Sequence, residues 1–515
     1  MYTPDLEKFR EIAKDADLIP VYREIDADLE TPVSAYLKIA RPPYSFLLES
    51  VEGGQNIARY SFIGTEPSGI LRTGPGQPDG DVDPLELLRS RMSGLKYAPA
   101  IGLPKFSGGS VGYLGYDAVR HFEPRVPPLP GVGVGVPEAV FMTIESILVF
   151  DHLRHKIAVT VNAPVSAAGA ESAYAKAVEQ IDLLIERIHG PLPLNARRKL
   201  SIKKRNASIN FSGPNVGSSV EKHVEDQGQS PSLVASEPKP NMSREKYQEM
   251  ITVALQAIRE GELILAVLSQ RFARPTKVRP FDLYRSLRGV NPSPYMYYLD
   301  LDGFQIIGTS PELLVQAIDG QVAVHPIAGT SPRGATPEED SELELRLRSD
   351  EKERAEHIML LDLGRNDIGR VAIPGTVRVT QKMDVERYSH VMHLVSHVTG
   401  TLREELDAFD VLRAGFPAGT VSGAPKVRAM ELIAELEVDR RGPYAGAVGY
   451  FAFGGNMDTA IGIRTIIFKD GVAHLQAGGG VVADSTPDDE YQECLHKIGA
   501  LMHAIDQAEE FIVGG

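Results

Sequence analysis

A long polar segment at residues 192–240 is the feature that most constrains how this chain can fold. It is rich in Pro, Ser, Asn, Lys and Gly, with little of the apolar periodicity that helices and strands require. Patterned sequence precedes and follows it in a chain of 515 residues, so we expect a linker between an N-terminal domain at 1–191 and a second domain at 241–515. The one basic run, at 197–205, lies inside this segment, and we interpret it as solvated linker.

The two flanking parts mix short β-branched runs with amphipathic stretches. Before the linker, "RYSFIG", "ESILVFDH" and "KIAVTVNA" predict strands, and residues 167–188 predict a helix. After the linker, Ser243 is a candidate N-cap for an amphipathic helix. The turn sequences "DG" and "GGN" between neighbouring strand-like runs favour antiparallel hairpins. We therefore predict the α+β class and not a doubly wound parallel sheet.

Composition argues against several classes of function. The formal net charge is −15, whereas a nucleic-acid-binding protein needs a concentrated basic surface. No apolar run is long enough to span a bilayer, and the charged N-terminal sequence lacks the apolar centre of a secretory signal. We expect a cytoplasmic protein without a membrane or nucleic-acid partner. The single cysteine, Cys494, follows the Glu493 carboxylate, which would raise its pKa, so we interpret it as a structural thiol.

Two similar carboxylate pairs are the strongest sign of chemistry. Glu353 and Glu356 lie in "EKERAEHIMLLDLGRND", and Glu490 and Glu493 lie in "PDDEYQECLHKIGALM". A spacing of three residues places each pair on one face of a helix, where like charges repel unless a cation lies between them. Magnesium suits hard oxygen ligands of this kind. One pair alone is typical of an exposed charged face, and for the two together a magnesium site and a solvated face remain open alternatives.

Three histidines, His390, His393 and His397, fall at helical spacing in "ERYSHVMHLVSHVTG". On a helix they would form a stripe and would not converge on one ion, which disfavours zinc. We predict one acid/base or hydrogen-bonding histidine with two structural companions.

Small-residue turns lie beside expected strands in "IAGTSPRG", "FPAGTVSGAPK" and "QAGGGVVADS". Their glycines let backbone N–H groups approach an anion, and Thr330 and Thr420 add hydroxyl donors. With Tyr444 and Arg464, which we place on nearby strands, the turns predict a pocket for a small carboxylated molecule. Each turn alone would also fit an ordinary loop. None of the glycine-rich runs matches a dinucleotide or ATP motif, so neither cofactor is expected.

Six segments in order resemble one known family. They are "HPIAGTSPRG", "ERAEHIMLLDLGRNDIGRV", "ERYSHVMHLVSHVTG", "FPAGTVSGAPKVRAMELI", "AIGIRT" and "QAGGGVVADSTPDDEYQE". Together they resemble the chorismate-utilising enzymes, most closely the large subunits of the anthranilate synthases, over residues 240–510. The N-terminal "FLLES" and "RYSFIG" are also similar. The resemblance implies a layered α+β fold in which central antiparallel β-sheets are flanked by helices and two subdomains are interleaved.

The resemblance also implies a reaction and a cofactor. Chorismate and ammonia would be converted through 2-amino-2-deoxyisochorismate to anthranilate and pyruvate, the first step of tryptophan biosynthesis. Glu356 and Glu493 would hold Mg²⁺, and Glu353 and Glu490 would steady its waters.

The remaining site residues implied by the resemblance fall into two groups. The catalytic group would be His393 as the acid or base, with Glu312 and Thr420 around it. The group that binds the carboxylates of chorismate would comprise Gly329, Thr330, Tyr444, Arg464, Gly478, Gly479 and Gly480.

Two positions distinguish reactions within the family. Many aminodeoxychorismate synthases carry a nucleophilic lysine where this chain has Ala328, and anthranilate synthases carry alanine, which leaves room for ammonia. Isochorismate and salicylate synthases have a water-activating lysine at the position of Leu265, where anthranilate synthases usually have glutamine, so Leu265 departs from the pattern. Two alternatives are an aminodeoxychorismate synthase large subunit and a non-catalytic protein that binds tryptophan or chorismate.

Finally, the resemblance implies feedback inhibition and a partner. Glu49 and Ser50 of "FLLES", with Pro294, Tyr295 and Met296 of "NPSPYMYY", would bind tryptophan away from chorismate. Core packing would explain either segment alone. The chain has no glutaminase domain, so ammonia would come from solution or from a glutamine amidotransferase subunit, and we expect a hetero-oligomer.

Overall fold

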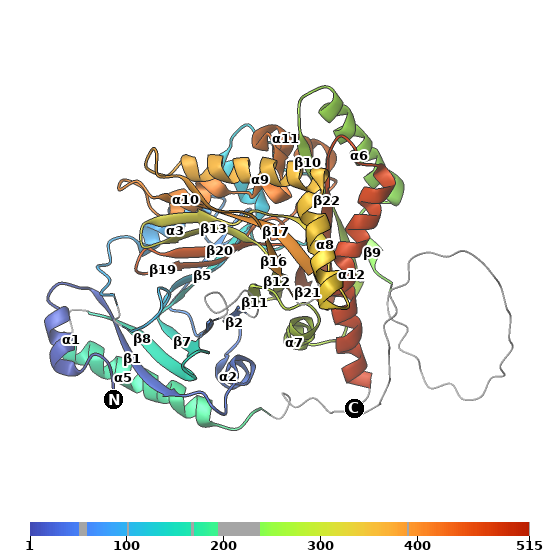
Figure 1. The fold of residues 1–515 in the computed structure, drawn as a ribbon. Coiled ribbons are helices and arrows are strands. Elements are labelled where there is room, and N and C mark those ends of the chain that lie inside the picture. Colours follow the sequence, from blue (N-terminus) through green and yellow to red (C-terminus); the bar gives the residue numbers. More distant parts are fainter. Residues whose placement is uncertain (51–58, 100–101, 166–168, 194–236, 389–390, 514–515) are drawn as a thin grey trace, which may run out of the picture.

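The computed structural model describes the whole chain except residues 51–58, 100–101, 166–168, 194–236, 389–390 and 514–515. Most of the expected linker at 192–240, including its basic run, lies outside the described residues, so the predicted domain boundary stays a prediction. Two antiparallel sheets stack on each other and carry helices on their outer faces (Figure 1). This arrangement confirms the predicted α+β class. Among the described helices, none is both long and apolar enough to cross a membrane.

The first sheet contains strands from both sides of the 192–240 segment. Its N-terminal strands meet its C-terminal strands where Leu48 pairs with Tyr297. The strand order is β1 (Leu18–Asp26), β8 (Lys156–Pro164), β7 (Ser146–Asp151), β3 (Tyr60–Thr65), β2 (Tyr44–Glu49), β11 (Tyr295–Leu301), β12 (Phe304–Ser310), β21 (Thr465–Lys469), β22 (Val472–Val481), β10 (Leu265–Pro275) and β18 (Gly423–Ala424), with β9 (Lys239–Pro240) paired to β10.

The second sheet is built in the same interleaved way. Its two parts meet where Gly449 pairs with Gly112. The strand order is β15 (Ile327–Pro332), β17 (Val391–Thr401), β14 (Gln321–Val324), β13 (Leu313–Ile318), β20 (Met457–Ile461), β19 (Ala447–Ala452), β5 (Gly109–Leu114), β6 (Ala139–Ile144) and β4 (Gly69–Thr73), with β16 (Arg378–Arg387) paired to β17.

Apolar side chains from both sheets fill the layer between them. Phe46 and Tyr297 come from the first sheet, and Tyr113, Val140 and Val448 come from the second, and all are buried in one cluster. Alternate residues of a strand point to opposite faces, so the other faces of the sheets are free to carry helices. The two parts of the chain therefore share one inter-sheet core, as the interleaved fold predicts.

Helices cover the outer faces. On the first sheet, α2 (Pro32–Ile39) and α5 (Ala170–His189) pack on the N-terminal strands, and α6 (Arg244–Arg259), α7 (Pro280–Val290) and α12 (Pro487–Val513) pack on the C-terminal ones. On the second sheet lie α8 (Pro337–Ser349), α9 (Glu351–Gly369) and α10 (Ala408–Gly415). The other described helical elements are α1 (Leu6–Ile12), α3 (Pro84–Met92), η1 (Tyr116–Ala118), α4 (Val119–Phe122), η3 (Gly419–Val421) and α11 (Lys426–Leu436).

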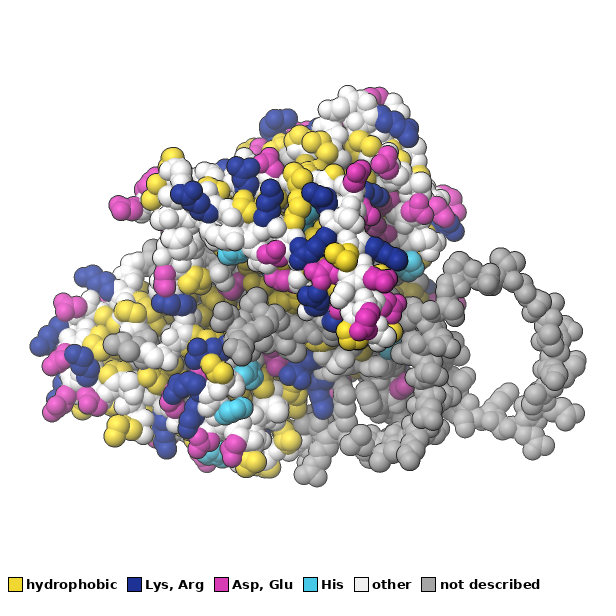
Figure 2. All heavy atoms as spheres, in the orientation of Figure 1, with side chains coloured by type: hydrophobic (Ala, Val, Ile, Leu, Met, Phe, Trp, Pro, Cys, Tyr) yellow, Lys and Arg dark blue, Asp and Glu magenta, His cyan; other side chains and the backbone are white. Residues whose placement is uncertain are grey.

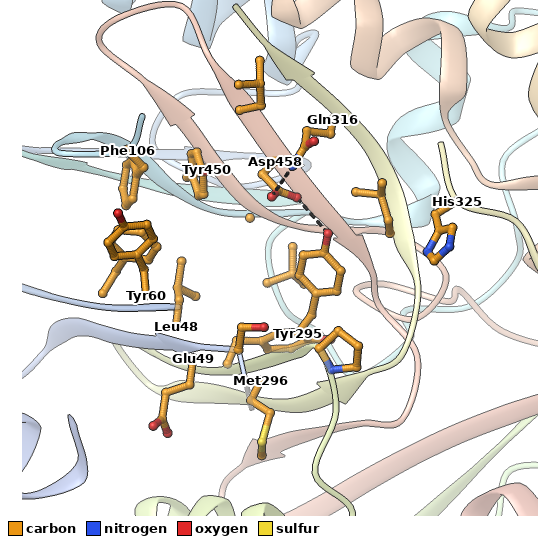
Figure 3. Close-up of a pocket in the computed structure, with 18 of the residues that line it drawn as sticks. Leu48, Glu49, Tyr60, Phe106, Tyr295, Met296, Gln316, His325, Tyr450 and Asp458 are labelled. Carbon is orange, nitrogen blue, oxygen red and sulfur yellow. Dashed lines mark hydrogen bonds between the residues drawn. The ribbon is translucent and has the colours of Figure 1, made fainter. Parts of the chain in front are cut away.

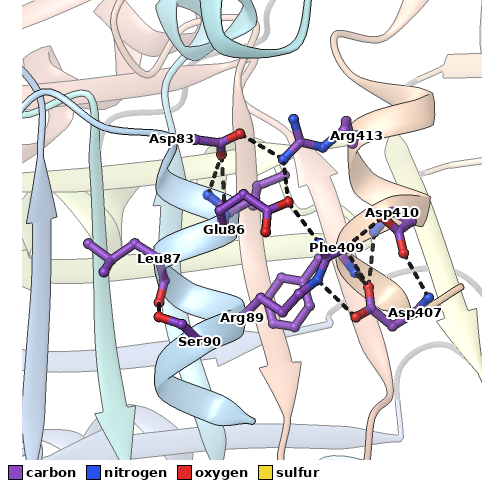
Figure 4. A network of polar contacts seen from close by, with 10 residues as sticks. Asp83, Glu86, Leu87, Arg89, Ser90, Asp407, Phe409, Asp410 and Arg413 are labelled. Atoms are coloured by element: carbon purple, nitrogen blue, oxygen red, sulfur yellow. Dashed lines mark hydrogen bonds and ion pairs between the residues drawn. The ribbon is translucent and has the colours of Figure 1, made fainter.

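A charged network joins α3 to α10 across the two parts of the chain (Figure 4). Arg89 donates to both oxygens of Asp407, at 2.9 and 3.0 Å, and to Asp410 at 2.6 Å. Arg413 of α10 donates to Asp83, which directly precedes α3, at 2.7 Å. On the face shown in Figure 2, basic and acidic side chains of the described residues are interspersed.

Local signals in the sequence place several elements correctly. The "DG" turn at Asp302 and Gly303, both with positive φ, joins β11 to β12 in an antiparallel hairpin. Ser243 caps α6, where its side chain accepts a hydrogen bond from the backbone of Lys246.

Candidate active site

The two carboxylate pairs lie on helices, as their spacing predicts. Glu353 and Glu356 occupy the first turns of α9, where the Asp350 side chain caps the helix by accepting from the Glu353 N–H at 3.0 Å. Glu490 and Glu493 occupy the first turns of α12. Each pair therefore points from one helical face near a helix N-terminus, where negative charge is favoured.

The carboxylates of α9 and α12 lie close enough to repel one another. Burial raises the pKa of Glu356, and the charge of Glu493 raises it further. Burial also raises the pKa of Glu353, with the charge of Glu356 next in effect. Burial raises the pKa of Glu490 to about 7, and the charge of Glu493 adds to that rise. The two helices thus present four acidic groups to one space.

The surroundings of Glu490 and Glu353 fit a cation. The Oε2 atom of Glu490 is buried and has no hydrogen-bond partner among the described residues. A Cβ at Gly479 would lie 2.0 Å from that oxygen, and a Cβ at Gly329 would lie 3.0 Å from Oε2 of Glu353. Glycine at both positions therefore leaves room for the carboxylates. A buried carboxylate oxygen without a donor is suited to a metal ion or to a metal-bound water.

The ligand atoms of the four glutamates of α9 and α12 are farther apart than those of a compact metal chelate. Among the described residues, the one group of three acids or histidines whose ligand atoms all lie within 4.8 Å is Asp81, His121 and Glu138. Arg120 already pairs with both carboxylates of that group. A wider arrangement at the four glutamates suits magnesium, because this ion keeps several waters and takes one or two carboxylates directly.

Lys497 is a site residue that our sequence analysis missed. It lies one helical turn after Glu493, and its Nζ atom is 2.6 Å from Oε1 of Glu493 and donates to the Gly478 carbonyl at 2.9 Å. Its charge also lowers the pKa values of Glu312, Glu356 and Glu490, although burial dominates at each of them. The i,i+4 spacing from Glu493 in "ECLHK" is the signal that would have indicated it.

The Gly478–Gly480 run lies in β22 beside these acidic groups. Gly478 pairs with Ser269 and Gly479 with Leu268 of β10. A Cβ at Gly478 would lie 2.1 Å from the Leu268 carbonyl oxygen, so glycine permits this close approach.

Cys494 is buried close by, and its thiol donates to the Ala477 carbonyl at 3.2 Å. Burial, more than the charge of Glu493, raises the pKa of this thiol to about 12, which agrees with a structural thiol.

Gly329 forms a bulge in β15 that sets the position of His393. The β15–β17 register shifts between Ala328 and Thr330, and Gly329 has a φ of +73°. Nδ1 of His393 lies 3.1 Å from the Gly329 carbonyl oxygen and 3.1 Å from Oγ1 of Thr330. Burial lowers the pKa of His393, so the ring is neutral near pH 7.

The histidine stretch is a strand, and the helix that we predicted there is wrong. His393 and His397 both lie in β17, and His390 lies outside the described residues. His397 contacts Thr380, with Nδ1 and Oγ1 2.7 Å apart, and its ring packs against that of His325. The β-branched residues of "HVMHLVSHV" and pairing with neighbouring strands outweigh the helical spacing of the histidines.

Glu312 and Thr420 form a second polar centre. The Thr420 hydroxyl donates to Oε1 of Glu312 at 2.9 Å. Burial raises the pKa of Glu312 to about 8, so this carboxyl is mainly protonated at neutral pH. A small cavity of about 40 Å³ lies against both residues. A group with such a pKa can give or take a proton near pH 7.

Tyr444 and Arg464 lie in turns, which corrects our placement of both on strands. The segment "TAIGIRTIIF" forms two strands, β20 and β21, that belong to different sheets, and the chain turns between them at Arg464 with a φ of 51°. The Arg464 side chain donates to the backbone carbonyl of Lys497 at 3.1 Å. Burial lowers the pKa of Arg464, while Tyr444 and Glu493 act electrostatically to raise it. The tyrosine, the arginine and the acidic groups therefore share one region.

Ala328 and Leu265 belong to one small apolar cluster. They are buried with Val267 and Leu360, and partly buried Met359 and Val482 pack against them. Neither position offers a nucleophile or a polar group to this part of the site.

The five residues that we assign to tryptophan line a second, larger cavity, which shares Leu313 and His325 with the small cavity at Glu312. This cavity, of about 770 Å³, lies between the sheets and is lined by Glu49, Ser50, Pro294, Tyr295 and Met296, among others. Figure 3 shows the Tyr295 ring pointing into the cavity toward Asp458. Asp458 accepts from the Tyr295 hydroxyl at 3.2 Å and from the Gln316 amide at 2.8 Å.

Two of these five side chains point away from the cavity (Figure 3). Glu49 and Met296 are paired across β2 and β11, so both face the opposite side of the sheet. There Glu49 accepts hydrogen bonds from Tyr284 and Arg288 of α7. Leu48 and Tyr295, on the other face, contribute side chains to the cavity instead.

The structure thus brings the predicted catalytic, substrate and metal residues into one region and places the predicted regulatory residues at a second one. The model of the chorismate binding enzyme family matches residues 43–503. The chain belongs to this family, a class that the layered fold and the carboxylate-lined site also indicate.

Several relatives of this chain are named anthranilate synthase component 1. The chain is 46% identical to anthranilate synthase component 1 of Acetivibrio thermocellus, over 99% of this chain and 100% of the relative. It is 42% identical to anthranilate synthase component 1 of Saccharomyces cerevisiae, over 98% of this chain and 97% of the relative. The crystal structure of anthranilate synthase component I from Streptococcus pneumoniae superposes with a TM-score of 0.73 and 37% identity, covering 93% of this chain and 98% of that one.

Proposed function

We propose that this protein is the ammonia-using component of an anthranilate synthase, which converts chorismate and ammonia to anthranilate and pyruvate. The observation that carries the proposal is the convergence of the glutamates of α9 and α12 with His393, Arg464 and the Gly478–Gly480 run, in a chain that matches anthranilate synthase components over their full length.

Binding of chorismate would use the positive and hydrogen-bonding groups of the site. Its two carboxylates match the Arg464 guanidinium and the backbone N–H groups near Gly478–Gly480, with Thr330 and Tyr444 as hydroxyl donors. Glu356 and Glu493 would hold Mg²⁺ directly, and Glu353 and Glu490 would hold its waters. When bound, magnesium supplies a Lewis acid that neutralises a substrate carboxylate.

Proton transfer in the first half-reaction falls to Glu312. Ammonia forms a bond to the ring carbon next to the carboxylate-bearing carbon, a ring double bond shifts, and the C–O bond to the ring hydroxyl breaks. The departing hydroxide needs a proton, and Glu312, with a pKa of about 8, can supply it while Thr420 orients the carboxyl. The attached ammonia then loses one proton, which replaces the proton that Glu312 gave, and the products of this step are 2-amino-2-deoxyisochorismate and water.

His393 serves the second half-reaction. Its Nδ1–H is engaged by the Gly329 carbonyl, so Nε2 has a free lone pair and can act as a base. The carbon that bears the new amino group loses its proton to Nε2, the C–O bond to the enolpyruvyl group breaks, and the ring becomes aromatic. Anthranilate and pyruvate result.

Ammonia is the nucleophile that this site favours. The apolar cluster of Ala328 and Leu265 contains no lysine to attack the ring or to activate water. We propose that a glutamine amidotransferase subunit delivers the ammonia, that tryptophan binds in the 770 Å³ cavity as a feedback inhibitor, and that the protein acts in the cytoplasm.

The position of the new nitrogen tests the proposal. Purified chain is incubated with chorismate, Mg²⁺ and ¹⁵N-ammonium, and the products are resolved by chromatography and NMR. The proposal predicts ¹⁵N ortho to the carboxylate, in anthranilate, with one pyruvate released per product. Nitrogen at the para position would instead indicate an aminodeoxychorismate synthase, and unchanged chorismate would indicate a binding protein.

A further inference from the structure

Arg441 is a fully buried arginine that lies behind the proposed site. Its side chain is 0% exposed, and four hydrogen bonds engage all three nitrogens of its guanidinium. Two go to the Glu437 carboxylate, at 2.9 and 2.6 Å, and the other two go to the backbone carbonyls of Val421 at 2.8 Å and Val267 at 2.7 Å. A buried ion pair of this kind is costly to desolvate, so its retention calls for a reason beyond stability.

The two carbonyls belong to two walls of the site. Val421 directly follows Thr420 in η3, so its bond to Arg441 fixes the turn that carries the Thr420 hydroxyl. Val267 lies in β10 opposite Gly480, so the second bond fixes the strand against which the glycine run packs. One guanidinium therefore holds two segments of the site, the η3 turn and strand β10.

Tyr444, which forms a third wall of the site, also contacts the Arg441 guanidinium. The Arg441 carbon Cζ lies 5.6 Å from the centre of the Tyr444 ring, and 4.6 Å from that of Tyr116. The Tyr444 N–H also donates to the Arg441 carbonyl at 3.3 Å. Attraction between a cation and an aromatic ring is stronger in a dry environment, so Arg441 holds the tyrosine from behind.

Hydrogen bonds connect Glu437 through Ser269 to strand β22. Its Oε1 atom accepts from the Ser269 N–H at 2.8 Å and from the Ser269 hydroxyl at 2.9 Å. The Ser269 hydroxyl in turn accepts from the Gln476 amide at 2.8 Å, two residues before Gly478. The ion pair thus reaches the strand that carries the glycine run.

We propose that Arg441, paired with Glu437, is a positioning residue that holds the Thr420 turn, Tyr444 and the β10–β22 pair at the spacing that chorismate requires. This inference rests on the proposed function for its substrate. Arg441 touches no reacting atom, and it acts through the backbone and the ring that it supports. Fixed geometry of this kind matters for catalysis, because a displacement of about 1 Å can cost about 100-fold in rate.

The test separates positioning from stability with paired variants. Arg441→Met alone leaves the Glu437 charge buried and is expected to lower Tm strongly. Arg441→Met with Glu437→Gln removes both charges and keeps an acceptor for Ser269. Tm should therefore recover most of that loss, short of the contribution of the hydrogen bonds to Val421 and Val267. Arg274→Met is the matched control, because Arg274 is a buried arginine with a side chain 4% exposed that pairs with Asp506 and Glu509 of α12.

The readouts are Tm, KM and kcat for chorismate consumption, and the affinity for chorismate by calorimetry. We expect the double variant to recover most of the Tm lost in Arg441→Met but to lose about 100-fold in kcat/KM and at least part of its affinity. Arg274→Met should lose Tm and keep kcat/KM. A double variant with wild-type kcat/KM and affinity would overturn the inference. Consumption of chorismate does not depend on the product, so a wild type that forms another product contradicts the proposed function alone. A wild type that neither binds nor consumes chorismate contradicts both.

Discussion

The Nδ1 atom of His393 lies 3.1 Å from the backbone carbonyl oxygen of Gly329. A carbonyl oxygen accepts hydrogen bonds and does not donate them, so Nδ1 carries the proton and Nε2 is left as the basic nitrogen. The bulge at Gly329 turns this carbonyl toward the histidine. The strand geometry of β15 therefore selects the tautomer that the proposed role of His393 as a base requires.

His393→Asn tests the roles of the two ring nitrogens separately. The asparagine amide can still donate to the Gly329 carbonyl, but it has nothing in place of Nε2. We expect kcat to fall by about 10²- to 10⁴-fold while Tm stays near the wild-type value, as measured by steady-state kinetics and calorimetry. His397→Asn, on the same strand, should keep kcat. An asparagine variant of His393 with more than a tenth of wild-type kcat would exclude this histidine as the base.

Glu356→Gln or Glu493→Gln tests the magnesium proposal through stability. For the wild type, Mg²⁺ at about 100 times its Kd should stabilise the fold by about 2.7 kcal/mol. Either variant should lose that increase. Without Mg²⁺, Glu356→Gln should also be more stable than the wild type, because it removes a buried charge that Glu493 repels. Scanning calorimetry with and without Mg²⁺ gives both values. Glu351→Gln, exposed at the start of α9, should keep the full Mg²⁺ response. An equal Mg²⁺ response in all variants would show that these glutamates hold no metal.

The raised pKa of Glu312 predicts how stability depends on pH. Its carboxyl has a pKa of about 8 when folded, against 4.5 as the ordinary value, so between these limits the native state holds a proton that the unfolded state has lost. The stability from this group is complete below about pH 4.5 and is lost as pH rises toward 8. Denaturant unfolding at several pH values should show a decline in the wild type that is steeper by up to about 1.4 kcal/mol per pH unit than in Glu312→Gln. Parallel curves for the two proteins would contradict the protonated state of Glu312.

Asp458 is the carboxylate that Tyr295 and Gln316 hold in the second cavity (Figure 3), where it can pair with the amino group of an amino acid. Asp458→Asn should raise the tryptophan concentration for half-inhibition by about tenfold or more, because a charged hydrogen bond is lost. Inhibition curves at fixed chorismate measure this, and kcat without tryptophan should stay unchanged. Asp300→Asn, a residue of β11 outside the cavity lining, is the control. Undiminished inhibition in Asp458→Asn would place the inhibitor elsewhere.

The features that could be predicted from the sequence are those whose signal is local. The spacing of Glu353 and Glu356 fits one helical turn, and the "DG" turn at Asp302 fits a two-residue hairpin, and both occur as predicted. The His393 stretch was misread because intervals of three and four fit a helix, whereas the strand depends on partners in β15, β14 and β16 that are distant in sequence. Arg464 was misplaced because a turn between two sheets leaves no break in the apolar pattern.

Contacts between distant residues could not be read from local patterns at all. Arg441 bonds to Val267, 174 residues away, and looks in the sequence like an ordinary charged residue of a turn. Glu49 belongs to the predicted regulatory segment, but which face of β2 it occupies depends on the pairing with Met296 in β11. The sequence indicates which segments form the site, and the sheet register decides which side chains face it.

Formation of anthranilate by the purified chain is the most direct test of the proposed activity. The measurement follows anthranilate fluorescence after chorismate is mixed with the chain, Mg²⁺ and an ammonium salt, with glutamine in place of ammonium as the control. We expect fluorescence that requires chorismate, Mg²⁺ and ammonium, and no product from glutamine without a partner subunit. Consumption of chorismate without anthranilate, or product formed equally well after chelation of Mg²⁺, would contradict it.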